Sequence, residues 1–286
     1  QGSSDGAGTV NFNASQTLAG NVGTSANSLS SIVLASSVAI TANSYNIDAT
    51  NITLGSSSSL TLTSGSLVGN VALASSSTLT IGSGGLTGKV DGSAANVGTV
   101  TFNSTGAITL ASGTTIGSNS DASTTNGVSA VNITGTSAVT ANDAIKATTV
   151  TIGDGTNTAS LALAASKAIT GNVVINASGT LTLNNSSSVS GTINAASSGV
   201  GTLAIASSSS VVAAANIGGS SSSTALSSVT VGSSSTLNLA TNNVTLRATT
   251  VSLTGTLTAG SGVVTGTIQG SSDGAGTVNF NASQTL

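Results

Sequence analysis

The chain lacks several residue types on which enzyme active sites depend. Its 286 residues include no Cys, Pro, Met, Trp or His, and all seven acidic residues are Asp. Without His, Cys or Glu, few groups can titrate or attack near neutral pH. We therefore expect no enzyme, no catalytic residues and no cofactor. The absence of Cys also excludes a disulfide framework, which fits a surface protein that crosses a membrane before it folds.

Charge is scarce as well. Only 4% of the residues are charged and the net charge is −3, with Lys89, Lys146, Lys167 and Arg247 as the only cations. No basic patch is available to neutralise phosphates, so nucleic acid and anionic membranes are not expected as partners. No unbroken run of 18 apolar residues occurs, so this segment is not expected to insert into a membrane.

Aromatic residues make up 1% of the chain, whereas 38% is hydrophobic and the mean hydropathy is +0.38. Disordered segments combine low hydrophobicity with high net charge, so this composition does not predict disorder. A wide core cannot be filled without large side chains. We expect a thin core of Val, Ile, Leu and Ala.

The most informative feature is an identical repeat. Residues Gln1 to Leu18 return unchanged as Gln269 to Leu286, so the sequence has a 268-residue period. A fixed long period is typical of repeat architectures. The sequence therefore predicts one full solenoid repeat over 1–268 and the start of the next identical repeat over 269–286, as in a tandem array.

Short alternating segments recur along the chain, and each has apolar residues at both ends of a polar one. This two-residue period predicts β-strands, and helical spacing is absent. The segments are Val10–Phe12, Leu60–Leu62, Leu79–Ile81, Val100–Phe102, Val150–Ile152, Leu181–Leu183 and Val229–Val231.

A second recurrent signature has a Gly, a polar residue and then Val or Ile. We interpret these glycines as structural turn residues, placed where a Cβ atom would oppose the backbone conformation. They are Gly20, Gly69, Gly88, Gly171, Gly191 and Gly266.

The fold predicted from these patterns is an all-β solenoid, a parallel β-helix with three short strands per coil and an expected right-handed winding. Leu60 and Leu79 align at a spacing of 19 residues, whereas leading strands over the whole repeat give about eleven coils, with a mean near 24 residues. The extra length is expected in polar loops at 91–98, 117–127 and 218–223. Eleven coils at about 4.8 Å would advance the solenoid by roughly 50 Å per repeat.

Two ligand hypotheses follow from local patterns. The segment Gly153–Asp154–Gly155–Thr156–Asn157 could hold an incidental calcium ion, although the repeated calcium-binding nonapeptide is absent. We expect no other metal site. Outward Thr residues such as Thr61 and Thr63 could form a ladder like that of an ice-binding solenoid, or could simply face solvent on their strands.

Phrases such as GTVNFNASQTLAGNV and GTVTFNSTGAITLASGTTIGS resemble the repeat regions of bacterial autotransporter-type surface antigens, particularly rickettsial outer-membrane protein passengers. The resemblance implies a secreted, surface-exposed passenger that serves in adhesion or in forming a coat. It assigns no binding residue.

The leading functional hypothesis is a structural extracellular filament or cell-surface stalk built from tandem repeats, with the chain itself as partner, end to end and in lateral bundles. The alternative is a multivalent adhesin, in which loops at 93–98 or 118–126 contact a host-cell or glycan surface and many copies give avidity. An ice-binding solenoid is a minor alternative.

Overall fold

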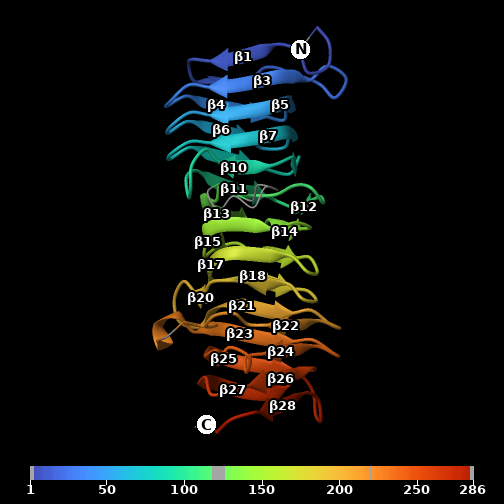
Figure 1. The fold of residues 1–286 in the computed structure, drawn as a ribbon, viewed down its shortest axis with the longest axis vertical. Coiled ribbons are helices and arrows are strands. Elements are labelled where there is room, and N and C mark those ends of the chain that lie inside the picture. Colours follow the sequence, from blue (N-terminus) through green and yellow to red (C-terminus); the bar gives the residue numbers. More distant parts are fainter. Residues whose placement is uncertain (1–2, 118–125, 220, 284–286) are drawn as a thin grey trace. The chain divides into compact units, whose positions relative to one another are not determined.

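A computed structural model describes residues 3–117, 126–219 and 221–283. These residues form a β-solenoid of about 13 turns, which confirms the predicted fold class. The only helix among them is a three-residue 3₁₀ turn, Ser222–Thr224. Strands of successive coils pair in parallel, as Figure 1 shows.

The chain divides into two compact units, Gln1–Thr148 and Thr149–Leu286. The strands of the first unit are β1 (Thr9–Phe12), β2 (Gln16–Thr17), β3 (Leu29–Leu34), β4 (Ala39–Asn43), β5 (Ile47–Leu54), β6 (Ser59–Leu62), β7 (Leu67–Leu73), β8 (Thr78–Ile81), β9 (Leu86–Thr87), β10 (Val90–Gly92), β11 (Thr99–Ser104), β12 (Ala107–Leu110), β13 (Val128–Gly135) and β14 (Ala138–Ala141).

Strand β15 (Ile145–Ile152) includes residues of both units. The strands of the second unit are β16 (Ala159–Leu163), β17 (Ala168–Ile175), β18 (Gly179–Leu183), β19 (Ser188–Val189), β20 (Ile193–Ala195), β21 (Val200–Ile205), β22 (Ser210–Val212), β23 (Leu226–Val231), β24 (Thr236–Asn238), β25 (Leu246–Leu253), β26 (Thr256–Ala259), β27 (Val264–Gly270) and β28 (Thr277–Phe280).

One coil of the first unit shows how alternation builds the core. Strand β7 starts on one face with Leu67, bends at Gly69, and continues on the next face with Val71 and Leu73; β8 then forms the third face. These three apolar side chains are buried. In the register with the next coil, Leu67 lies beside Leu86. Aliphatic side chains therefore stack in columns inside the solenoid, and polar ones face outward.

Serine-rich turns connect faces and also join coils. Ser57 and Ser186 adopt left-handed conformations with φ of 58° and 57°, which a residue with a Cβ normally avoids. The conformation directs their N–H groups along the stack. Ser57 donates to the carbonyl of Ser75, and Ser186 to that of Ser210, both at 2.9 Å. The turns thus continue the hydrogen-bonded ladders between the strands.

The observed coils contain fewer residues on average than the spacing of the leading strands predicted. About 13 turns over the whole chain corresponds to roughly 22 residues per turn, near the short end of the usual range for solenoid repeats. The prediction counted Val100 as the successor of Val71, but Val71 pairs with Val90, and Val100 pairs with Leu79 on another face. A strand with a single clear apolar position, such as β10, gives too weak a signal to be counted.

The 268-residue period contains three sub-repeats. Segments 88–103, 191–206 and 266–281 align without gaps, each beginning Gly-x-Val/Ile and each carrying a second Gly-Thr-Val/Leu motif further along. The residues Gly98, Gly201 and Gly276, at or near this second motif, have φ of 75°, 73° and 82°. A Cβ built on each would collide with the preceding coil, at 2.3, 2.6 and 2.5 Å respectively. The three segments are therefore equivalent in structure as well as in sequence.

Each sub-repeat starts one face further round the coil than the last. The segments IDATNITL, IKATTVTI and LRATTVSL begin at Ile47, Ile145 and Leu246. In the first unit, the second face of the strand that begins at Ile47 carries a column that starts at Ile52 and passes through β7 and β10. Two isolated bridges of Ile116 then carry the column to Ile145. In the second unit, the equivalent column leads from Val173 through β20 to Leu246. The second face of one sub-repeat thus becomes the first face of the next.

Candidate functional site

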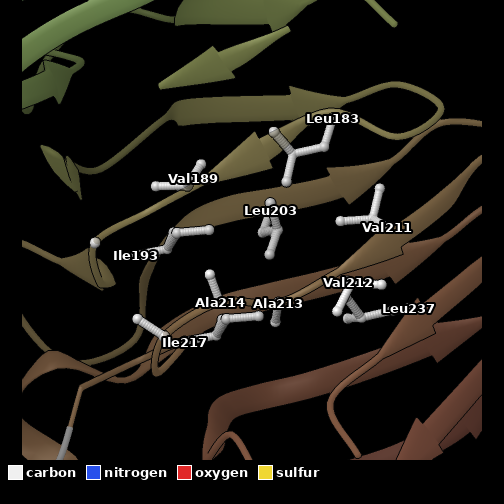
Figure 2. Close-up of a pocket in the computed structure, with 12 residues that line it drawn as sticks. Leu183, Val189, Ile193, Leu203, Val211, Val212, Ala213, Ala214, Ile217 and Leu237 are labelled. Carbon is white, nitrogen blue, oxygen red and sulfur yellow. The ribbon is translucent and has the colours of Figure 1, made fainter. Parts of the chain in front are cut away.

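Among the described residues of the second unit, a gap lined by aliphatic side chains is too small for a ligand. The gap among buried side chains of the second unit measures about 10 Å³ and is lined by aliphatic residues, among them Val189, Val211 and Leu237. Figure 2 shows only carbon atoms on the labelled side chains around it. This volume is at the lower limit for one water molecule, and the lining side chains offer no polar partners. A site is therefore to be sought on the outer surface.

Chemistry-bearing residues are dispersed over that surface. Among the described residues, no group of three or more His, Cys, Asp or Glu side chains could hold a metal ion. No helix in the described ranges has the length and apolarity of a membrane span. Asp154, suggested above as a calcium ligand, accepts hydrogen bonds from the backbone of Thr156 and Asn157 at 2.9 and 2.8 Å. Its carboxylate thus stabilises its own turn.

The six predicted turn glycines fall into different environments. Gly69, Gly88, Gly171 and Gly266 have φ between 122° and 143°, a region that side chains with a Cβ rarely adopt. A Cβ on Gly69 would lie 2.0 Å from the carbonyl oxygen of Ala49 in the preceding coil.

The other two glycines differ from this group. Gly191 has an ordinary φ, but a Cβ there would lie 2.4 Å from Oδ1 of Asn172. Gly20 has an ordinary φ and nothing within 4 Å of a built Cβ. At five of the six positions, therefore, the backbone angle or the preceding coil restricts substitution. Gly20 lies in the coil of β1, which has no preceding coil among the described residues.

A groove of about 430 Å³ lies on the outer face of the first unit. Three successive strands, β5, β7 and β10, supply outward side chains to it, and the register places Asn51 beside Asn70, and Ala72 beside Asp91. The remaining polar residues of the lining are Thr53, Ser93 and Asn126. We call this surface the Asp91 groove, because Asp91 is the one charged residue among its described lining.

Asp91 has an unusual environment for a carboxylate on a solenoid face. Its Oδ1 is buried and has no hydrogen-bond partner. Burial raises the pKa of Asp91, and the nearby positive charge of Lys89 partly opposes this shift. An unpaired, shielded oxygen costs free energy, so the position is not explained by stability. The sequence interpretation placed Asp91 at the start of a polar loop; the alternation Lys89–Val90–Asp91 could have identified an outward strand position.

A second groove, of about 360 Å³, lies in the same unit beside the loop at 23–25. Its acidic residue is Asp48, whose pKa is raised by burial and, to a smaller extent, by the charge of Asp5. The pKa of Asp5 itself is lowered, chiefly by the hydroxyl of Ser28, which donates to Oδ1 at 2.6 Å.

The other loops that the sequence singled out are only partly described. The predicted adhesive loop at 118–126 lies outside the described residues except for Asn126, and residue 220 of the loop at 218–223 also lies outside them. The loop at 93–98 is described. Its backbone joins the Asp91 groove to the neighbouring coil, because Asn96 donates its N–H to the carbonyl of Gly127 at 2.7 Å.

Comparison with protein-family models, with curated proteins and with solved structures gave no match to this chain. The fold and the three aligned segments by themselves define the class of the chain as a β-solenoid with threefold internal repetition.

Proposed function

We propose that the chain is the repeating unit of a structural filament or stalk outside the cell, in which tandem 268-residue repeats continue one solenoid. The observation that supports this most directly concerns the two identical segments. The first copy of TVNF, β1, pairs with the following strand β3, and the second copy, β28, pairs with the preceding strand β26. The two copies together define both neighbours of one strand in a continuous stack.

The equivalent strands inside the chain have both of these neighbours. In the first unit, β11 lies between β8 and β13. In the second unit, β21 lies between β18 and β23. By sub-repeat equivalence, β28 should be followed by a strand with the sequence of β3. A second repeat supplies that strand without any change of register.

The one-face shift between sub-repeats supports the same proposal. A coil has three faces, so three successive shifts of one face return the chain to the face on which it started. A tandem array with this period can therefore continue the same columns through every repeat. Nearest-neighbour stacking of this kind adds stability with each coil, and needs neither a wide core nor disulfides.

The composition of the outer surface fits a structural rod better than a catalytic site. Outward strand positions are occupied mainly by Ser, Thr, Asn and Ala, and one row of the second unit runs Ser160, Thr180, Thr202 and Ser228 in register. Such a surface carries little charge to prevent lateral contact between rods. The proposal therefore includes bundling of rods, and a location at the cell surface like that of the antigens the sequence resembles.

Electron microscopy of proteins with one, two and three tandem repeats tests the proposal. At roughly 22 residues per turn, one repeat makes about 12 turns, and each turn advances by about 4.8 Å. Each added repeat should lengthen the particle by about 58 Å at constant width, with an axial reflection near 4.8 Å. Particles that widen, or that separate into beads of fixed size, would contradict a continuous rod.

A further inference from the structure

The second copy of the repeated segment is held less firmly than the internal coils. No residue of 271–283 is buried, although β28 is paired with β26. Strand β28 is the last strand of its sheet, so its outer edge has no partner strand among the described residues. Segments with few buried contacts open at a low cost in free energy. We therefore expect 271–283 to leave β26 more readily than an internal strand leaves its neighbours.

The surface that 271–283 covers binds it through specific positions. Strand β28 pairs with β26 in register. The backbone N–H groups of Thr277 and Asn281 donate to carbonyls of the preceding coil, those of Gly255 and Ala259, both at 2.9 Å. An identical segment placed on β26 would make the same contacts.

Such a segment occurs a second time in the chain. Residues 3–15 have the same sequence as 271–283. Strand β1 pairs with the following strand β3, and its other edge is open in the described part of the chain. That open edge is equivalent to the edge through which β28 binds β26. Strand β1 of one copy can therefore dock on β26 of another copy without leaving its own coil.

The balance of contacts favours such an exchange. The ladder between β28 and β26 is lost, and an identical ladder between β1 and β26 replaces it, so the two contributions nearly cancel. Before the exchange, β1 and β28 each have an open edge; afterwards no open edge remains at the junction, and the released segment regains conformational entropy. The opposing contribution is the loss of translational and rotational freedom when two chains associate. Assembly should therefore depend on concentration, and should increase when docking of 271–283 is weakened.

We propose that chains of this sequence join end to end by segment exchange, in which residues 3–15 of one copy displace 271–283 of another copy from β26. The partner is a second copy of the same chain, and the junction has the register of a tandem array. This mode of joining rests on the proposed function, because it requires that the columns of one solenoid continue into the next. It allows a rod to grow longer than a single polypeptide.

A pair of matched glycines provides the test. A Cβ on Gly276 would lie 2.5 Å from Cβ of Leu253, whereas one on Gly8 would lie 3.7 Å from its nearest neighbour. Both glycines have a positive φ, so the backbone strain is common to the two substitutions. After the exchange, Gly8 takes the place of Gly276 beside Leu253. Gly276→Ala should therefore promote assembly by weakening the resident segment, and Gly8→Ala should block assembly by obstructing the incoming one.

Sedimentation velocity of the full chain at increasing concentration measures the assembly. Gly276→Ala should lower the concentration of half-assembly about tenfold or more relative to the unsubstituted chain. The double variant, Gly8→Ala with Gly276→Ala, should return to the monomer. Equal assembly of the double variant and Gly276→Ala would overturn the proposal, because it would show non-specific association of a destabilised unit. A Gly276→Ala chain that stays monomeric at every concentration would overturn it too.

A cysteine pair tests the register of the junction, since the chain has no Cys of its own. Asn279 lies beside Thr258, so the exchange places Asn11 of the incoming copy beside Thr258. Mixed Asn11→Cys and Thr258→Cys chains, both with Gly276→Ala, should form a disulfide-linked dimer under mild oxidation, because paired strands are close enough for a disulfide. The control Asn238→Cys, one coil away from Thr258, should react with the Asn11→Cys chain about tenfold more slowly or less.

Equal cross-linking at the two positions would overturn the proposed register, even if Gly8→Ala failed to fold. Circular dichroism of Gly8→Ala separates blocked docking from loss of its own coil. The filament proposal is tested separately, by the length of tandem repeats. Tandem chains that lengthen by the expected increment while Gly276→Ala stays monomeric would exclude segment exchange and leave the filament proposal intact.

Discussion

Two regions of the molecule share one sequence but not one environment. Strands β1 and β28 both read TVNF, yet Phe12 is 8% exposed and Phe280 is 42% exposed. Phe12 lies beside Leu34 of the following coil, whereas Phe280 lies beside Ala259 of the preceding one. The aromatic ring is therefore buried by the coil that follows it, and its own sequence does not determine its burial.

The glycines that precede β1 and β28 depend on the other neighbour, the preceding coil. Gly8 and Gly276 have similar φ, 86° and 82°. A Cβ on Gly8 would be 3.7 Å from its nearest neighbour, a side-chain atom of Leu29, but one on Gly276 would be 2.5 Å from Cβ of Leu253 in the preceding coil. The preceding coil imposes the need for glycine, and the following coil buries the Phe. A coil is complete only with both neighbours, as nearest-neighbour stacking requires.

The largest effect is expected from supplying the missing neighbour. Extending the chain after Leu286 with residues 19–54 of the repeat should pair Thr277–Phe280 with a copy of β3. Amide hydrogen exchange in that strand should then slow by about 100-fold or more, because the strand changes from an open edge to a two-sided ladder. The control is Thr99–Ser104, which already has both neighbours and should exchange at an unchanged rate. Unchanged exchange at 277–280 would argue against tandem continuation.

The matched glycines give the next largest effect. Gly276→Ala adds a steric collision to the left-handed strain, and should destabilise the second unit by about 3 kcal/mol or more. Gly8→Ala meets only the strain, about 1 kcal/mol. Urea unfolding of the two variants provides the measurement. Equal costs would mean that contact with Leu253 is relieved by a backbone shift.

For the matched phenylalanines, substitution in the first copy should cost more stability than substitution in the second, the opposite of the glycines. Phe12→Ala removes a buried ring and should cost about 3 kcal/mol, whereas Phe280→Ala removes a half-exposed ring and should cost less than about 1 kcal/mol. The same urea experiment applies. If Phe280→Ala proved as costly as Phe12→Ala, the second copy would already have a covering partner in solution, and lateral or end-to-end association would be the first explanation to test by sedimentation.

Alternating residues such as Leu60–Leu62 and Leu79–Ile81 were sufficient to predict parallel coils and the inward columns, because a two-residue period has one physical interpretation when both segments recur at a fixed spacing. The count of coils was less accurate. Strand β10 buries a single aliphatic residue, Val90, followed by Asp91 and Gly92. Alternation alone does not distinguish such a strand from a loop.

The candidate site was harder to predict, because it arises from register. Asn51, Asn70 and Asp91 come from three successive coils and belong to no sequence motif, and only the pairing of β5, β7 and β10 brings them to one groove. The one-face shift between sub-repeats was equally hidden, since it depends on which columns the isolated bridges of Ile116 and Ile217 join. The turn glycines were recognised by their motif, but sequence did not separate Gly191, which has an ordinary φ, from Gly69, which has a φ of 143°.

The smallest predicted effect concerns Asp91. Gln269 occupies the aligned position in the repeated segment. Because burial raises the pKa of Asp91 above its ordinary value of 3.8, the folded chain binds this proton more tightly than the unfolded chain. The favourable contribution is present below pH 3.8 and is lost as pH rises through the raised pKa. At pH 7 Asp91→Asn should therefore increase stability, by less than about 1 kcal/mol because the group is half-exposed and screened.

This gain should disappear near pH 3, where both variants carry a neutral side chain. Asp5→Asn should show the opposite sign, since hydrogen bonds from Ser28 lower the pKa of Asp5 and its contribution is lost as pH falls. Urea midpoints of the two variants at pH 7 and pH 3 give the comparison. A gain from Asp91→Asn at pH 7 that disappears at pH 3 would show that the carboxylate is kept at a cost to stability. If Asp91→Asn instead destabilised the chain at pH 7, the carboxylate would have a stabilising partner in the fold.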